Sequence, residues 1–293
     1  MQRLIVSIFS LAMTLGGFVA HLHGDTKAEQ LLAQARAALG GEKNMSRVQG
    51  LTCNGSYERT VGDRQLSGEV TIDLQLPDKM LRTESMSPFG DMTMLVEQGI
   101  NGEKLLRNQR TINAPPGAVV RMPPPPTGDA EAQALRNARA DMTRTLLVML
   151  LAAPASMPLE YAYGGAAESD DGQADVIEAK GPGGFAAKIF LDQKTHRPLM
   201  LQYRGVAPQM RMVTQRGDGP PDPARSHEGE QAGPAAAPQV VDIALYLDDY
   251  KAVDGVQLPH RIARSVDGKP TEETTCKTIK VNPTFKLDTF AAK

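Results

Sequence analysis

The sequence lacks tryptophan altogether, and aromatic residues make up only 4% of its 293 residues. This scarcity counts against the stacked aromatic platforms that bind carbohydrates or single-stranded nucleic acids. A charge excess of either sign is also missing, because 32 Lys and Arg stand against 34 Asp and Glu. Such a balance gives no general attraction to DNA or to an anionic membrane surface. We therefore expect no nucleic-acid partner.

Motifs that identify catalytic or metal sites are missing as well. The chain contains no GxxxxGK[ST], HExxH, CxxC, GxSxG or SxxK sequence. The histidines His196, His227 and His260 are too dispersed to indicate a metal cluster. Asp248 and Asp249 are strand neighbours that should point to opposite faces, so they do not form a catalytic pair. We predict no catalytic residue, no metal and no cofactor. An exported enzyme on an unrelated β-fold is kept as an alternative.

Cysteine occurs only twice, at Cys53 and Cys276, with a spacing that fits no metal site. In an oxidising compartment the two would form one disulfide between the first and last strands. The alternative is a pair of unbonded, buried thiols. The sequence leaves both interpretations open.

Long apolar runs are confined to the N-terminus. Arg3 precedes a mainly apolar segment from Leu4 to Ala20, which is the pattern of a secretory signal. We assign residues 1–24 to a signal peptide, with an uncleaved anchor as the alternative. No cysteine lies near the cleavage region, which excludes a lipobox. Since no other run approaches the roughly 18 apolar residues that span a bilayer, we expect a periplasmic or secreted protein.

The sequence does contain many segments in which apolar and polar residues alternate. Leu66 to Leu76 places apolar side chains on one face and polar ones on the other, the pattern of a half-buried antiparallel strand. We count about ten or eleven such strands, at 51–60, 66–76, 79–84, 92–96, 159–163, 174–180, 185–191, 198–203, 240–247, 260–266 and 273–281.

The stretch from Val240 to Val266 organises the rest. Its first strand puts Val241, Ile243, Leu245 and Leu247 on one face. A turn follows at Asp254-Gly255, a dipeptide that tolerates positive φ at both positions and is a strong hairpin signal. The returning strand is expected to open at Pro259 and to run from His260. We predict a long antiparallel hairpin over residues 240–266, which we call the organising hairpin.

Two helices are expected. Thr26 and Glu29 form a capping box, with Asp25 adding negative charge, for a helix that ends at Gly40-Gly41. A second helix should run from about Ala130 to Ala153, capped by Asp129 and ended by Pro154. Its second half, residues 146–153, is apolar on every side, so it is either buried all round or faces an apolar ligand. A Pro-rich connector at 113–128 and a disordered loop at 205–239 complete the expected layout.

Three short motifs resemble those of LolA/LolB-like lipoprotein carriers. They are Asp249-Tyr250-(x)3-Asp254-Gly255-Val256-(x)2-Pro259, the hairpin FLDQKTHRPLML and the ending KVNPTFKLDTF. The resemblance implies one α+β domain over residues 25–293, mainly antiparallel β, forming a curved half-barrel closed by helices. It also implies carrier activity. The alternative is a sensor or regulatory binding module of the RseB/MucB type that acts on a protein partner.

We therefore expect an exported carrier that holds lipid or lipoprotein acyl chains in the apolar concave face, with an envelope protein as a further candidate partner. Burial of acyl chains is favourable by about 0.8 kcal/mol per CH2 group and needs few polar contacts. Leu146, Leu147, Met149 and Leu150, in the second half of the second helix, are expected to border the cavity. The competing interpretation is that they fill a sealed core. The expected ligand-binding residues are Val70, Ile72, Leu74, Met92, Met94, Leu146, Leu147, Met149, Leu150, Leu245 and Leu247.

Overall fold

The computed structural model describes residues 25–62, 64–89, 92–113, 126–169, 172–206 and 239–291. The expected signal peptide, most of the Pro-rich connector and nearly all of the expected loop at 205–239 lie outside these residues. In the described part, twelve strands form one sheet in the order β5-β4-β3-β2-β1-β12-β11-β10-β9-β8-β7-β6, and all neighbouring strands pair antiparallel.

The strands fall into an N-terminal and a C-terminal group. The first group comprises β1 Gly50–Val61, β2 Arg64–Gln75, β3 Lys79–Phe89, β4 Met92–Asn101 and β5 Lys104–Ile112. The second comprises β6 Glu160–Ser169, β7 Gly172–Gly181, β8 Phe185–Asp192, β9 Pro198–Val206, β10 Val240–Val253, β11 Val256–Val266 and β12 Lys269–Val281. Because β1 pairs with β12, the two ends of the domain meet in the middle of the sheet.

The eleven strand ranges expected from the sequence are therefore one short of the twelve observed, and the missed strand is β5. Its consecutive leucines, Leu105 and Leu106, break the alternation of apolar and polar residues that predicts a strand. Both faces of β5 are covered at this point: α3 (Asp129–Leu150) contacts the strand, and Leu106 packs with Leu81 and Phe290 of the C-terminal segment. A strand covered on two faces carries apolar residues at successive positions.

The organising hairpin is confirmed, with one correction. Asp254 and Gly255 form the turn with φ of 49° and 84°, as the dipeptide predicts. The returning strand begins at Val256 rather than at His260, and Pro259 lies inside it opposite Tyr250. The second predicted hairpin, between β8 and β9, is closed by Asp192, whose Oδ1 accepts hydrogen bonds from the backbone N–H groups of Lys194 and Thr195.

The helices also differ from expectation at their ends. The N-cap of α1 (Thr26–Ala38) is Asp25, which accepts from the Lys27 N–H, so Thr26 is the first helical residue rather than the cap. The α3 helix spans Asp129–Leu150 with Gly128 as its N-cap, so Asp129 is not a cap and the helix stops short of Pro154. A short helix, α2 (Glu42–Met45), and a 3-10 turn, Pro182–Gly184, were not expected.

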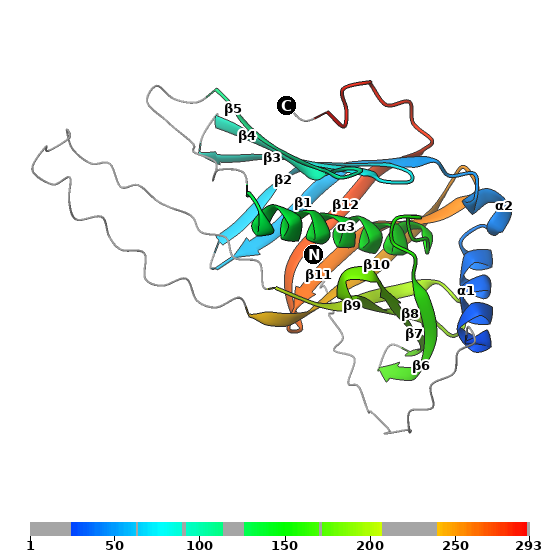
Figure 1. Cartoon of the computed structure of the whole chain (residues 1–293). Helices are drawn as coiled ribbons and strands as arrows, with labels where there is room; N and C mark the ends of the chain where they lie inside the picture. The colour runs from blue at the N-terminus through cyan, green and yellow to red at the C-terminus, as the bar shows by residue number, and fades with distance from the viewer. Residues whose placement is uncertain are drawn as a thin grey trace, which may run out of the picture.

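Figure 1 shows how these elements are arranged. The sheet curves around α3, which lies across its concave side between β3–β5 and β6–β9, while α1 stands at one end. The α3 helix contacts β4 and β5 of the first group and β9 and β11 of the second. A mainly antiparallel, open sheet with a few helices thus agrees with the predicted α+β, mainly antiparallel class.

Candidate functional site: the inner face of the sheet

The face of the sheet turned toward α3, which we call the inner face, carries the main core of the protein. Strands far apart in the chain contribute to it, because β1 and β12 are joined at its centre. Its buried members from these strands include Leu51, Cys53, Leu74, Cys276 and Ile279. An apolar, concave surface of this kind is suited to flexible apolar groups, since burial of such groups is favourable without directional contacts.

In this structure the inner face is filled by the C-terminal half of α3. Leu146, Leu147, Met149 and Leu150 are only 0–4% exposed and belong to the main core. They are sealed from solvent, as are Met142 and Val148 of the same helix. The predicted contact of these residues with a ligand therefore requires α3 to move, and their ligand-binding role stays a prediction.

The other predicted site residues lie on the same face. Leu74 and Leu247 are buried in the main core, and Ile72 and Leu245 are half-buried against it. Val70, Met92 and Met94 lie on strands of the first group but outside the residues of that core cluster. Val70 and Met92 are buried, and the Met94 sulfur accepts a hydrogen bond from the Gln109 amide at 3.0 Å.

Few polar contacts hold α3 in place. Among the described residues, the one side-chain hydrogen bond or ion pair from α3 to the sheet region joins Arg139 to Glu103, in the turn between β4 and β5, at 2.7 Å. Glu103 is 87% exposed, so this ion pair is screened by water and weak. Arg144 adds a cation–π contact, with its guanidinium carbon 3.9 Å from the Tyr203 ring centroid. Apolar packing is thus the main attachment of α3.

The α1 helix, by contrast, is fixed by polar contacts at both ends. At its start, Asp25 Oδ2 accepts from the backbone N–H of Tyr163 on β6 at 2.6 Å. At its end, Leu39 O accepts from the Gln257 N–H on β11 at 2.8 Å. A β-carbon at Gly40 would overlap the carbonyl oxygen of Gly255, so α1 ends directly against the organising hairpin.

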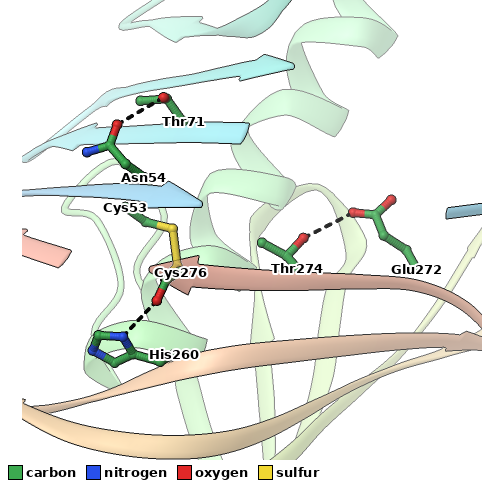
Figure 2. Close-up of a disulfide and its surroundings, with 7 residues drawn as sticks. All are labelled: Cys53, Asn54, Thr71, His260, Glu272, Thr274 and Cys276. Carbon is green, nitrogen blue, oxygen red and sulfur yellow. Dashed lines mark hydrogen bonds between the residues drawn. A yellow bond between two sulfur atoms is a disulfide. The ribbon is translucent and has the colours of Figure 1, made fainter. Parts of the chain in front are cut away.

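The two cysteines form a disulfide in the middle of the inner face, which decides between the two alternatives left open by the sequence (Figure 2). It links neighbouring strands β1 and β12 across a separation of 223 residues. His260 of β11 lies beside it and donates from Nδ1 to the Cys276 carbonyl oxygen at 2.8 Å. Its Nε2 is buried and has no hydrogen-bond partner among the described residues.

Beyond the disulfide, the inner face becomes polar. Tyr57 and Arg59 continue the face that Cys53 begins on β1, because the register with β2 runs unbroken. Glu272 lies opposite Arg59 on β12, and Arg264 lies opposite Glu272 on β11. A cross-strand row of alternating charge, Arg59–Glu272–Arg264, therefore crosses three adjacent strands.

Arg82 and Glu84 of β3 complete this polar cluster. Arg59 donates to Glu84 at 2.7 and 3.1 Å and to Glu272 at 2.5 Å. Arg82 donates to the same two carboxylates, at 2.7 Å each. Burial alone would raise the pKa of the Glu272 carboxyl, but Arg82, Arg59 and Arg264 together bring it below its usual value. Glu272 is therefore held as a carboxylate.

Sequence reasoning missed this polar cluster, although a signal for it exists. Counting in steps of two from Cys53 reaches Tyr57 and Arg59, and counting back from Cys276 reaches Thr274 and Glu272. If both cysteines face inward, these residues must face inward too. Charged residues at inward positions of a strand mark a polar part of the interior.

Within the described ranges, no group of three or more His, Cys, Asp or Glu residues is placed to hold a metal ion. The helices of those ranges include none with the length and apolarity needed to cross a bilayer.

No protein-family model matches the chain, and no curated protein matches it. Similar solved structures exist at low identity. They include a LolA superfamily protein from Nitrosomonas europaea, with 11% identity, a TM-score of 0.48 and coverage of 90% of this chain and 96% of that chain. A DUF1329 family protein from Desulfovibrio piger has 10% identity, a TM-score of 0.46 and coverage of 90% and 96%. An outer membrane lipoprotein-sorting protein domain from Vibrio parahaemolyticus has 11% identity, a TM-score of 0.44 and coverage of 90% and 97%. The function proposed below rests on the geometry of this chain.

Proposed function

We propose that the protein is an exported carrier that binds lipid acyl chains on the inner face of its sheet, with α3 as a displaceable cover. The observation that supports this proposal is the way α3 is attached. Its buried side chains are apolar apart from Thr143, and one exposed ion pair, Arg139–Glu103, joins its side chains to the sheet region. An acyl chain that replaces the helix exchanges one apolar contact for another, so the exchange costs little.

The energetics of such an exchange are favourable for a long chain. Removal of the helix exposes the apolar inner face, and each methylene group that covers it again contributes about 0.8 kcal/mol. Because the strands are held together by backbone pairing and by the Cys53–Cys276 disulfide, the face keeps its shape when α3 leaves. The α1 helix stays in place through its polar contacts with β6 and β11.

The disulfide also supports export. Structural disulfides form and persist in oxidising compartments such as the periplasm or the extracellular space. Together with the apolar N-terminal segment of the sequence, this supports a periplasmic or secreted location.

We do not favour the sensor module or an enzyme. Among the described residues, the exposed large apolar side chains lie at three separate places: Ile112, the pair Val206 and Val240, and Leu287. A protein-docking surface is typically a contiguous apolar patch of several hundred Å². The inner face is a larger apolar surface than any of these three places, and the helix that covers it, α3, is displaceable.

The direct test is to extract the purified protein with organic solvent and to identify lipids by mass spectrometry, followed by titration with a fluorescent fatty acid. Saturable binding with hydrogen-exchange changes in α3, and none in β1 or β12, is the expected result. Glu103→Gln removes the ion pair to Arg139 and should speed fatty-acid association about 1.5- to 5-fold, since an exposed ion pair contributes about 0.2–1 kcal/mol.

Asp242→Asn is the matched control, because it removes an exposed carboxylate that pairs with Arg204 on the face of the sheet opposite to α3. This variant should leave the association rate unchanged. Absence of both co-purified lipid and saturable fatty-acid binding would overturn the proposed function.

A further inference from the structure

Arg264 is a third arginine of the inner face, beside the cluster formed by Arg59 and Arg82. Within the described part of the chain its guanidinium makes no ion pair within 4 Å, although Glu272 lies opposite it on β12. The two carboxylate oxygens of Glu272 accept hydrogen bonds from Arg59 and Arg82. Arg264 Nε is buried and has no hydrogen-bond acceptor among the residues that the structure describes. A buried donor without an acceptor is costly and rare, so the position calls for a partner that the described residues do not supply.

A second arginine approaches the same place from α3. Arg144 lies over the Tyr203 ring, and its Nε is likewise buried without an acceptor. The α3 helix contacts β9, which carries Tyr203, and β11, which carries Arg264. Burial raises the pKa of the Tyr203 hydroxyl, Arg264 and Arg144 act to lower it, and Asp141 and Glu272 act to raise it. Asp141, one turn earlier on α3, binds Arg144 at 2.7 Å, and its side chain is 60% exposed. Burial raises the pKa of the Asp141 carboxyl, while Arg144 and Arg264 both act to lower it, so this carboxylate offsets part of the positive charge. Arg144 of α3 and Arg264 of the contacted strand β11 thus each carry a buried Nε donor without an acceptor among the described residues.

Apolar groups border these cations directly. Leu245 lies opposite Arg264 on β10, and Leu201 lies opposite Leu245 on β9. The side chains of this cross-strand row therefore change from charged on β11 to apolar on β10, and Leu201 belongs to the main core. Ile262, two residues before Arg264 on the same face, also packs against that core. A ligand with a charged end and an apolar body would match this change along the face.

We infer that Arg264 and Arg144 form a binding site for the anionic headgroup of an amphiphile whose acyl chain lies on the inner face. The inference rests on the proposed function and narrows it to a ligand class. The headgroup is a carboxylate or a phosphate, because both accept hydrogen bonds from guanidinium groups, often in pairs. Because Arg144 belongs to α3 and Arg264 to the sheet, an anion held between them would couple headgroup binding to the position of the helix.

The test compares 11-(dansylamino)undecanoic acid with its methyl ester, which has the same chain without the charge. At pH 8 the wild-type protein should bind the acid about tenfold more tightly than the ester, which corresponds to about 1.4 kcal/mol. Raising the salt concentration should weaken this preference, because screening acts on the ionic contact alone. Competition with oleate, 1-oleoyl lysophosphatidate and monoolein then separates carboxylate, phosphate and neutral headgroups.

Arg264→Met should abolish the preference for the acid, and Arg264→Lys should retain part of it, since lysine keeps the charge but not the planar fork. Arg204→Met is the matched control, because it removes an exposed arginine whose ion pair among the described residues is with Asp242, across β9 and β10. This control should keep the full preference. The acid-to-ester ratio in the wild type is informative even if a variant fails to fold.

The outcomes are distinct. Equal binding of acid and ester by the wild type would overturn the headgroup site while leaving the carrier function intact. Binding of neither probe would overturn the carrier function and the headgroup site with it. A preference for the acid that survives Arg264→Met in a folded variant would also overturn the assignment to Arg264.

Discussion

Arg59 and Glu272 lie directly opposite each other on β1 and β12, and Arg59 Nε donates to Glu272 Oε2 at 2.5 Å. These two strands join the two halves of the sheet, so the contact ties residue 59 to a residue more than two hundred positions later. Both side chains are mostly buried, with 18% and 13% exposed. A charge pair at such a position is costly to break, because the remaining partner keeps an uncompensated charge.

Glu272→Gln should therefore lower the free energy of unfolding at pH 7 by about 2–3 kcal/mol, somewhat less than the loss of a fully buried pair. The pKa of Glu272 lies below its usual value of 4.5 in the folded protein. Its stabilising contribution is thus present above the unfolded pKa and is lost as the pH falls through the folded pKa.

The difference between wild type and Glu272→Gln should accordingly shrink as the pH is lowered from about 5 towards 3. Urea unfolding at several pH values measures it. Glu273→Gln is the control, since the neighbouring carboxylate belongs to the opposite face and lies 3.8 Å from Arg261. A difference that grows on acidification would contradict the assigned direction.

Leu147→Ala should cost about 2–5 kcal/mol of stability, because the side chain is 1% exposed in the main core and its removal leaves a cavity. Leu147→Met preserves most of the volume and should cost less than about 1.5 kcal/mol. Urea melts of both variants check this. A nearly neutral Leu147→Ala would mean that α3 is not packed on the inner face in solution.

Gly40→Ala should destabilise the protein more than Gly41→Ala. Both residues have positive φ, at 122° and 82°, so both substitutions introduce backbone strain on the order of 1–3 kcal/mol. The added β-carbon meets the Gly255 carbonyl at position 40 and has nothing within 4 Å at position 41. The difference between the two thermal melting temperatures therefore isolates the contact of α1 with the hairpin. Equal losses would show that this contact is dispensable.

Replacement of Cys53 and Cys276 together by alanine should lower stability by about 2–5 kcal/mol, as for other structural disulfides that close long loops. Comparison of urea melts of the double variant with oxidised and reduced wild type separates the crosslink from the packing of the sulfur atoms. The unfolding midpoint of the reduced wild type should lie between those of the oxidised wild type and of the double variant. An unchanged midpoint on reduction would contradict a structural role.

The sequence by itself determined the local structure. Alternation identified eleven of the strands, and the pair Asp254-Gly255 specified its turn, because these residues adopt positive φ with little strain. Strand positions two apart share a face, so the sequence also identified apolar positions such as Ile72 and Leu247. It missed β5, whose two faces are both covered, and it misplaced the ends of α3 because caps depend on single residues.

Only the tertiary structure decided that the first strand and the last strand meet. Pairing of β1 with β12 depends on the closure of the whole chain, and no local pattern records it. That pairing forms the disulfide, brings Arg59 to Glu272 and places Arg264 next to an occupied carboxylate. The packing of α3 on the inner face is likewise a long-range result. Its apolar half predicted burial all round or contact with a ligand, and the curvature of the sheet decides that it is buried in this structure.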